Sequence, residues 1–156
     1  MAQVRFYPMR IRFQKLKDLL DQYDETNFAN LIFQSVNPDA QGNRDEYDLN
    51  AFVIRGNRSI NFEITDKEDL QRDPNFEYHR KNANKIALAN YHLSRAEIVA
   101  FREEDEHNSI EYLSFIPDDY ADSRYVSYKI IPRNFQGRID MLLDAVLNPS
   151  PPADPQ

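Results

Sequence analysis

The feature that most constrains the fold is residues 47–64, YDLNAFVIRGNRSINFEI, which have the pattern of a β-hairpin. Gly56-Asn57 predicts a type II′ turn, because glycine suits the first position of a two-residue loop. Side chains alternate along each strand, so folding the chain at this turn gathers the apolar pairs on one face. These pairs are Leu49 with Ile64, Ala51 with Phe62, and Val53 with Ile60. We expect that face to be buried, and the opposite face, which carries Phe52 and Ile54 among polar residues, to be less buried.

A second hairpin is predicted from residues 109–116 and 125–131, joined by the loop PDDYADSR. Their aromatic and β-branched residues have high strand propensity. Pro117 and Pro132 are expected to close the ends of these strands.

Residues 96–103 are expected to form a further strand, because they include β-branched and aromatic residues. The alternative is a helix, since Ser94 and Glu97 have the spacing of a capping box. The local pattern alone does not decide between the two.

Four stretches repeat apolar residues with the three- and four-residue spacing of an amphipathic helix. They are residues 9–23, 27–36, 76–92 and 138–147. Two alternatives stay open. Residues 3–12 would also suit an edge strand, and residues 27–36 would also make an acceptable strand.

Together these features predict an α+β domain. An antiparallel sheet built from the two hairpins, about residues 47–64 and 109–131, would be covered by three or four helices. Residues 1–147 contain no repeat or domain boundary, so they are expected to form a single domain. The proline-rich stretch 148–156 is expected to be an extended C-terminal tail.

The composition excludes several classes of site. The 156 residues contain no cysteine, which excludes disulfides, thiolate zinc sites and cysteine nucleophiles. The three glycines form no glycine-rich phosphate loop. No run approaches the roughly 18 apolar residues that span a membrane, and no signal-peptide pattern is present, so a cytoplasmic protein without membrane contact is expected. The net charge of −7 argues against broad nucleic-acid binding.

No group of residues has the spacing of a known catalytic or metal site, so we expect no cofactor and no bound metal. The histidines His79, His92 and His107 lack the spacing of a helical metal-binding pair. Acidic residues gather between positions 103 and 122, where they would serve an enzyme of unrecognised type. Consecutive carboxylates point in different directions, however, so a solvated acidic loop is the simpler interpretation.

Two surface features are candidate contacts. Arg55 and Arg58 should face each other at the tip of the first hairpin, where water tolerates them or an anion or partner binds them. A possible interaction surface combines exposed apolar residues of the hairpin with basic residues of the first predicted helix. These residues are Phe52, Ile54, Arg10, Arg12, Lys15 and Lys17.

The leading hypothesis is a non-catalytic protein–protein interaction domain or a structural subunit of a larger assembly, with a protein partner or self-association. One alternative is an accessory nucleic-acid-binding protein that uses the basic N-terminal helix together with Arg80, Lys81 and Lys85. The other is the enzyme with an acidic site at residues 103–122.

Overall fold

Strands with alternating burial dominate the chain. The computed structural model describes residues 3–38, 45–54, 61–63, 69–82, 86–120, 124–134, 136–139 and 145–150. In β1 (Gln3–Phe6), Val4 and Phe6 are buried, whereas Gln3 and Arg5 are more exposed. The same period of two recurs in β8 (Asn90–Ser94), where Tyr91 and Leu93 are buried. Each of these strands therefore presents one apolar face to the interior.

The larger of two sheets has seven strands among the described residues, in the order β13-β8-β3-β4-β1-β7, with β5 paired to β4. Besides β1 and β8 it contains β3 (Asn30–Val36), β4 (Glu46–Ile54), β5 (Asn61–Glu63), β7 (His79–Asn82) and β13 (Pro149–Ser150). β1 and β4 run parallel. The other pairs in this sheet are antiparallel.

The smaller sheet has six strands within the same described ranges, in the order β11-β10-β9-β2-β6, with β12 paired to β10. Its strands are β2 (Met9–Arg12), β6 (Leu70–Arg72), β9 (Tyr112–Asp119), β10 (Val126–Asn134), β11 (Gly137–Arg138) and β12 (Ala145–Leu147). All of these pairings are antiparallel.

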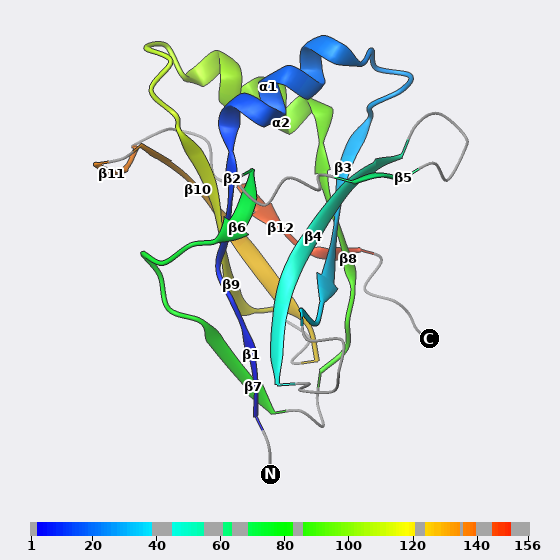
Figure 1. Ribbon diagram of the computed structural model, residues 1–156, viewed down its shortest axis with the longest axis vertical. Coiled ribbons are helices and arrows are strands. Elements are labelled where there is room, and N and C mark those ends of the chain that lie inside the picture. The colour runs from blue at the N-terminus through cyan, green and yellow to red at the C-terminus, as the bar shows by residue number, and fades with distance from the viewer. Residues whose placement is uncertain are drawn as a thin grey trace.

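Two neighbouring segments cross from one sheet to the other. The chain leaves β1 for β2 through Tyr7 and Pro8, and it returns from β6 to β7 through residues 73–78. β1 pairs with β7, and β2 pairs with β6. At the crossing the amide of Asp73 donates to the carbonyl oxygen of Pro8 at 2.8 Å. The two segments thus form one antiparallel ribbon that joins the sheets along one side (Figure 1).

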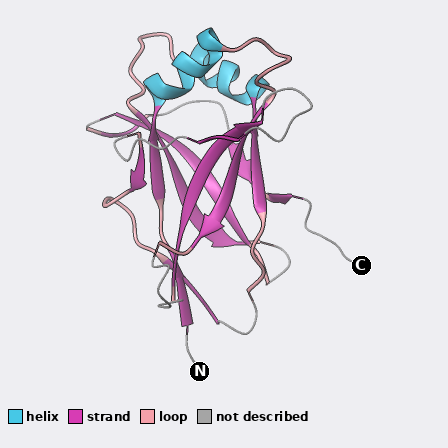
Figure 2. Ribbon diagram, turned by 45° about the vertical axis from the view of Figure 1, so that its right-hand side comes forward, coloured by secondary structure: helices cyan, strands magenta, loops and turns pink. Residues whose placement is uncertain are grey.

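The helices α1 (Phe13–Gln22) and α2 (Arg95–Glu104) lie together across one end of the sheets, as Figure 2 shows. Buried side chains of both helices and both sheets belong to a single hydrophobic core. Arg95 ties the helices together, because its guanidinium donates to the carbonyl oxygens of Leu20 at 3.0 Å and Tyr23 at 2.9 Å, at the end of α1. These bonds satisfy carbonyl groups that a helix end leaves without partners.

The predicted α+β fold is wrong. The described chain is mostly strand in two sheets, and its two helices cover one end of the sheets instead of three or four helices covering a face. The stretch expected to be a helix over 9–23 is helical only from Phe13 to Gln22, and Met9–Arg12 is the strand β2. The alternative prediction, an edge strand over 3–12, is closer to the structure, because this stretch contains β1 and β2. Neither strand is at a sheet edge, however.

The other three predicted helices are also wrong in the parts that the structure describes. Residues 27–36 contain β3, residues 76–92 contain β7 and part of β8, and residues 138–147 contain β12. In β3, Leu31, Ile32 and Phe33 are all buried because the strand lies between two others. Such a continuous apolar run has no period that separates a strand from a buried helix.

Residues 96–103 are the reverse case, since the expected strand is the helix α2. Ser94 is the N-cap, and its side-chain oxygen accepts from the amide of Glu97 at 3.1 Å. The Glu97 carboxylate in turn accepts from the amide of Ser94 at 3.1 Å. The capping box therefore outweighs the strand propensity of the β-branched residues.

The hairpin from β4 to β5 forms, but its predicted register is wrong. Val53 lies opposite Phe62 instead of Ile60, a shift of two residues on β5. The turn at Gly56-Asn57 and the residues Arg55 and Arg58 lie outside the described residues. A shift of two keeps every side chain on its original face, so the expected burial of Leu49, Ala51 and Val53 is confirmed.

The second hairpin is confirmed as the antiparallel pair β9 and β10. Its strands continue through Pro117 and Pro132, which were expected to end them. Pro117 lies beyond Tyr112–Phe115, the part of β9 that pairs with β2, so its missing N–H removes no bond to that neighbour.

Candidate functional site

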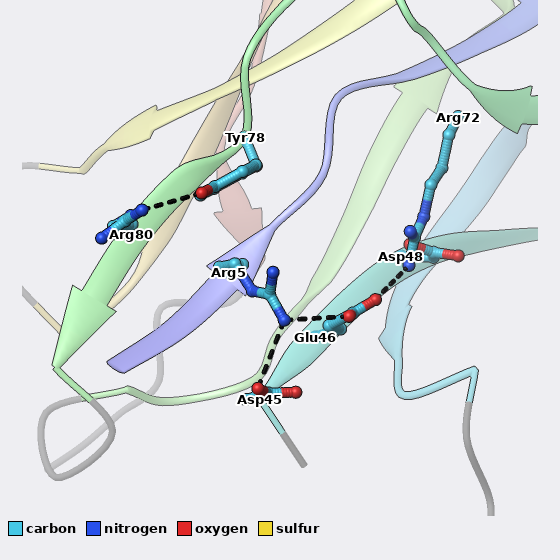
Figure 3. Close-up of polar contacts among 7 residues, drawn as sticks. All are labelled: Arg5, Asp45, Glu46, Asp48, Arg72, Tyr78 and Arg80. Atoms are coloured by element: carbon cyan, nitrogen blue, oxygen red, sulfur yellow. Dashed lines mark hydrogen bonds and ion pairs between the residues drawn. The ribbon is translucent and has the colours of Figure 1, made fainter. Parts of the chain in front are cut away.

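The most distinctive polar surface lies where the ribbon crosses between the sheets. Val4 and Phe6 of β1 point into the core, so Arg5 and Tyr7 lie on the outer side. The antiparallel partner β7 places Arg80 directly opposite Arg5. We call this surface the arginine–tyrosine face; it consists of Arg5, Tyr7, Arg72, Tyr78 and Arg80, with the carboxylates Asp45, Glu46 and Asp48. Figure 3 shows all of these residues except Tyr7.

Three guanidinium groups lie over two tyrosine rings on this face. The Arg72 guanidinium carbon is 3.6 Å from the ring centre of Tyr7, and that of Arg80 is 5.3 Å from the ring centre of Tyr78. The Arg5 guanidinium carbon lies beside both rings, 5.9 Å from the ring centre of Tyr7 and 5.6 Å from that of Tyr78. The two rings are 5.4 Å apart. Such cation–π contacts hold the cations in fixed positions without neutralising them.

Carboxylates from β4 and the residue before it neutralise two of these arginines. Glu46 bridges them, accepting from Arg5 Nη2 at 3.0 Å and from Arg72 Nη2 at 2.9 Å. Asp45 accepts from Arg5 at 3.2 Å, and Asp48 accepts from Arg72 Nε at 2.8 Å. Burial raises the pKa of Asp48, and the nearby charge of Glu46 adds to this, although Arg72 opposes it. Figure 3 shows Glu46 between the two guanidinium groups.

A hollow of about 490 Å³ opens beside the face. Residues of the ribbon line it, namely Tyr7, Arg10, Gln71, Arg72, Asp73, Pro74, Phe76, Glu77 and Tyr78. We call it the ribbon hollow. Its size is within the range of small-ligand and side-chain pockets.

A buried ion pair supports the ribbon hollow from below. Asp73 Oδ2 accepts from Arg133 Nη1 at 2.6 Å and from the Ser114 hydroxyl at 2.5 Å, and Asp73 Oδ1 accepts from the amide of Asn75 at 3.0 Å. Burial alone would raise the pKa of Asp73, but these hydrogen bonds and the charge of Arg133 hold the pKa below its ordinary value. The Arg133 guanidinium also lies 5.3 Å from the ring centre of Phe76. Through these contacts with Ser114 and Arg133, Asp73 fixes the segment 73–78 to β9 and β10.

The basic residues predicted to share one helix face are divided between two elements. Arg10 and Arg12 are on β2, whereas Lys15 and Lys17 are on α1. Lys17 donates to Asn108 at 2.7 Å, and Lys15 lies 4.0 Å from the Asp69 carboxylate. Of the four, Arg10 lines the ribbon hollow.

The predicted hairpin surface contributes little to this site. Phe52 is only 8% exposed, and Ile54 belongs to β4 as the strand approaches the undescribed turn. Sequence reasoning missed Arg5, Tyr7 and Tyr78. The alternation of residues 3–7 would have placed Arg5 and Tyr7 on the face opposite Val4 and Phe6, whereas Arg10 does not follow this alternation, because the consecutive residues Pro8 and Met9 are both buried.

The acids of 103–122 do not converge where the structure describes them. Asp105 accepts from the amides of Ser109 at 2.7 Å and Ile110 at 3.0 Å, so it caps a turn. Asp119 accepts from Lys81 and His79, each at 2.9 Å. Hydrogen bonds from Lys81 first, and then from His79, lower the pKa of Asp119. These carboxylates have structural partners on different elements.

Comparisons with protein-family models, curated proteins and solved structures found no match. No helix in the described ranges has the length and apolar character needed to cross a membrane. The described residues also include no cluster of three or more His, Asp or Glu side chains able to hold a metal ion. What they present is the arginine–tyrosine face, whose chemistry is charge-assisted hydrogen bonding and ring stacking.

Proposed function

We propose that the protein is a non-catalytic interaction subunit that binds a partner protein through the arginine–tyrosine face. One observation carries the proposal: three guanidinium groups lie over the partly exposed rings of Tyr7 and Tyr78. Arginine and tyrosine are enriched at the energetic centres of protein interfaces, because each offers a large planar surface and hydrogen bonds together.

The position of the face on the sheets supports this proposal. Arg5 is on β1, between β4 and β7, and its neighbours Val4 and Phe6 are anchored in the core. Tyr78 follows the segment that Asp73 and Arg133 fix in place. Side chains held in this way lose little conformational entropy on binding, so more of the contact energy remains as affinity.

The balance of charge on the face favours a protein over nucleic acid. Arg5 and Arg72 are each paired with two carboxylates, from Asp45, Glu46 and Asp48. A phosphate backbone would have to approach these carboxylates, which repel it. A protein surface can match both signs of charge at once.

Site-specific photo-cross-linking in the native cells tests the proposal. A benzophenone amino acid replaces Tyr78, which preserves an aromatic ring, and in a matched control it replaces Lys129, an exposed residue on β10 of the smaller sheet. We expect a discrete protein adduct from position 78 and none from position 129. The adduct should disappear when Arg80→Glu is added, because that change reverses an exposed cation of the face.

Equal cross-linking from both positions, or none from position 78, contradicts the proposal. An adduct with nucleic acid at position 78 would favour the accessory nucleic-acid-binding function instead. An adduct with a second copy of the chain would identify the partner as the protein itself, which light scattering on the purified chain then checks.

A further inference from the structure

The geometry points to a carboxylate-binding pocket in the ribbon hollow, with Arg10 as the residue that holds the carboxylate. The inference rests on the proposed function, in that the carboxylate belongs to an Asp or Glu side chain of the partner protein. Arg72, Tyr7 and Tyr78 of the arginine–tyrosine face also line this hollow, but Arg10 has a different electrostatic environment from the paired arginines.

Arg10 is held in place and has no counter-charge among the described residues. Its neighbours Met9 and Ile11 are buried, and it lies opposite Gln71 in the pairing of β2 with β6. Its guanidinium carbon lies 4.4 Å from the ring centre of Tyr112. Its Nε is buried and has no hydrogen-bond partner among the residues that the structure describes.

Two other arginines near this crossing are already paired with carboxylates. Arg133 contacts Asp73 at 2.6 Å, and Arg72 contacts Asp48 at 2.8 Å and Glu46 at 2.9 Å. Arg10 has no carboxylate within ion-pair distance in the described chain. A buried donor without a partner is unfavourable, so an acceptor that reaches the Arg10 guanidinium stabilises the complex by removing that penalty.

The charge inside the hollow selects an anion. Of its two lining acids, Asp73 is buried and bound by Ser114 and Arg133, whereas Glu77 is exposed. The unpaired charge within is therefore that of Arg10. A single guanidinium matches one carboxylate in a two-bond geometry, whereas a doubly charged phosphate is usually bound by more than one free cation.

The walls select an apolar or planar group next to that carboxylate. Tyr7, Phe76 and Tyr78 line the hollow, and Pro74 adds apolar surface. A carboxylate bound there is partly withdrawn from water, which strengthens its hydrogen bonds to Arg10. The ligand class is thus an acidic residue beside an aromatic or aliphatic one in the partner chain.

Small carboxylates test the pocket without the partner. The full chain, labelled with ¹⁵N, is titrated with phenylacetate while the Arg10 Nε–H and the backbone amides of residues 70–78 are followed by NMR. We expect saturable shifts at these positions with an affinity of about millimolar, typical of so small a ligand. The neutral isostere phenylacetamide should cause no saturable shift of the Arg10 signal, because it lacks the charge.

Variants locate the binding group. Arg10→Gln should weaken phenylacetate binding at least about tenfold, whereas Arg102→Gln, on the exposed side of α2, should leave it unchanged. If Arg10→Gln disturbs the fold, Arg10→Lys keeps the charge but loses the two-bond geometry, and binding should still weaken several-fold.

Three results overturn the inference: no saturable shift at Arg10, equal binding of phenylacetamide, or phenyl phosphate binding more than about tenfold tighter than phenylacetate, which would mark a phosphate site. The NMR titration and the cross-linking experiment can fail independently of each other. Phenylacetate binding without a Tyr78 cross-link contradicts only the proposed function, and a Tyr78 cross-link without phenylacetate binding contradicts only the carboxylate pocket.

Discussion

Arg5 and Arg80 lie directly opposite each other on β1 and β7, so two like charges meet across an antiparallel pair. Such a pair is unfavourable unless other groups compensate. Glu46 lies opposite Arg5 on the parallel neighbour β4 and accepts its hydrogen bond at 3.0 Å, and the Tyr78 hydroxyl accepts from Arg80 at 2.8 Å. Glu46 therefore helps to neutralise two of the three arginines that share this surface.

Glu46→Gln should lower the melting temperature by about 2 to 4 °C, because one charge-assisted acceptor is lost for both Arg5 and Arg72. This decrease in melting temperature should become smaller as the salt concentration rises. The side chains of Arg5, Glu46 and Arg72 are partly exposed, so ions screen their charges. Thermal unfolding followed by circular dichroism at low and high salt measures both effects. Glu103→Gln, at the exposed end of α2, is the matched control and should change little; an equal effect there contradicts the bridging role.

Asp73→Asn should remove about 3 to 5 kcal/mol of stability at neutral pH, because it leaves the buried Arg133 without its counter-charge. The pKa of Asp73 is lowered in the folded state, so its stabilising effect is fully present above its ordinary value of 3.8 and is lost as pH falls through the lower, folded pKa. The pKa of Asp48 is raised in the folded state, chiefly by burial. Protonation of Asp48 as pH falls therefore favours the folded state, opposite to the effect of Asp73.

Urea denaturation of the wild type and of Asp73→Asn across pH 2 to 7 isolates the effect of Asp73. The difference in unfolding free energy should be constant from neutral pH down to about pH 5 and then narrow below about pH 4. A difference that stays constant to pH 2 would mean that folding leaves the pKa of Asp73 unchanged, which contradicts the lowered pKa.

The sequence predicts some elements well because one local pattern dominates them. β9 and β10 are rich in aromatic and β-branched residues, and their pairing follows from the short loop between them. The stripe through Phe13, Leu16 and Leu20 likewise identifies α1. Elsewhere two patterns compete, as where Ser94 and Glu97 cap a helix made of strand-forming residues.

The site was largely beyond the reach of local patterns. Arg5, Arg72 and Tyr78 come from three segments, and β1 and β4 pair in parallel although about forty positions separate Arg5 from Glu46. No sequence periodicity predicts that pairing or the crossing of the ribbon between sheets. Arg10 was identified among the basic residues, but for a helix face, because Met9 and Phe13 extend the apolar stripe of α1 into β2.

A pair of engineered cysteines should distinguish the observed register of β4 and β5 from the register expected from sequence. Phe52→Cys with Glu63→Cys places the two cysteines directly opposite each other, where a disulfide can form. Asn50→Cys with Glu63→Cys matches the expected register, but in the structure these positions are diagonal and too far apart. The chain has no other cysteine, so mobility on a non-reducing gel and thiol counting give a direct result. Preferential oxidation of the second pair would contradict the observed register.

Lys81 lies on the outermost strand of the larger sheet among the described residues, and its burial suggests a way in which that edge is protected. β7 is the last strand in its order, and Lys81 is only 8% exposed, with its ammonium 2.9 Å from the Asp119 carboxylate. It lies opposite Val4, so its side chain shares the inward face of β1. An inward-pointing charge on an edge strand opposes pairing with another chain, because the added strand would have to bury it further.

Lys81→Val should therefore leave the domain folded but increase its self-association. The stability of the monomer should change little, because burying the Lys81 ammonium is costly and valine suits both the strand and the interior. Light scattering over a concentration series should show dimers or larger species for Lys81→Val and a smaller change for Arg80→Val, its exposed neighbour on the other face. A Lys81→Val protein that associates no more than the wild type would show that the lysine serves only its ion pair with Asp119, and that β7 is protected by other means.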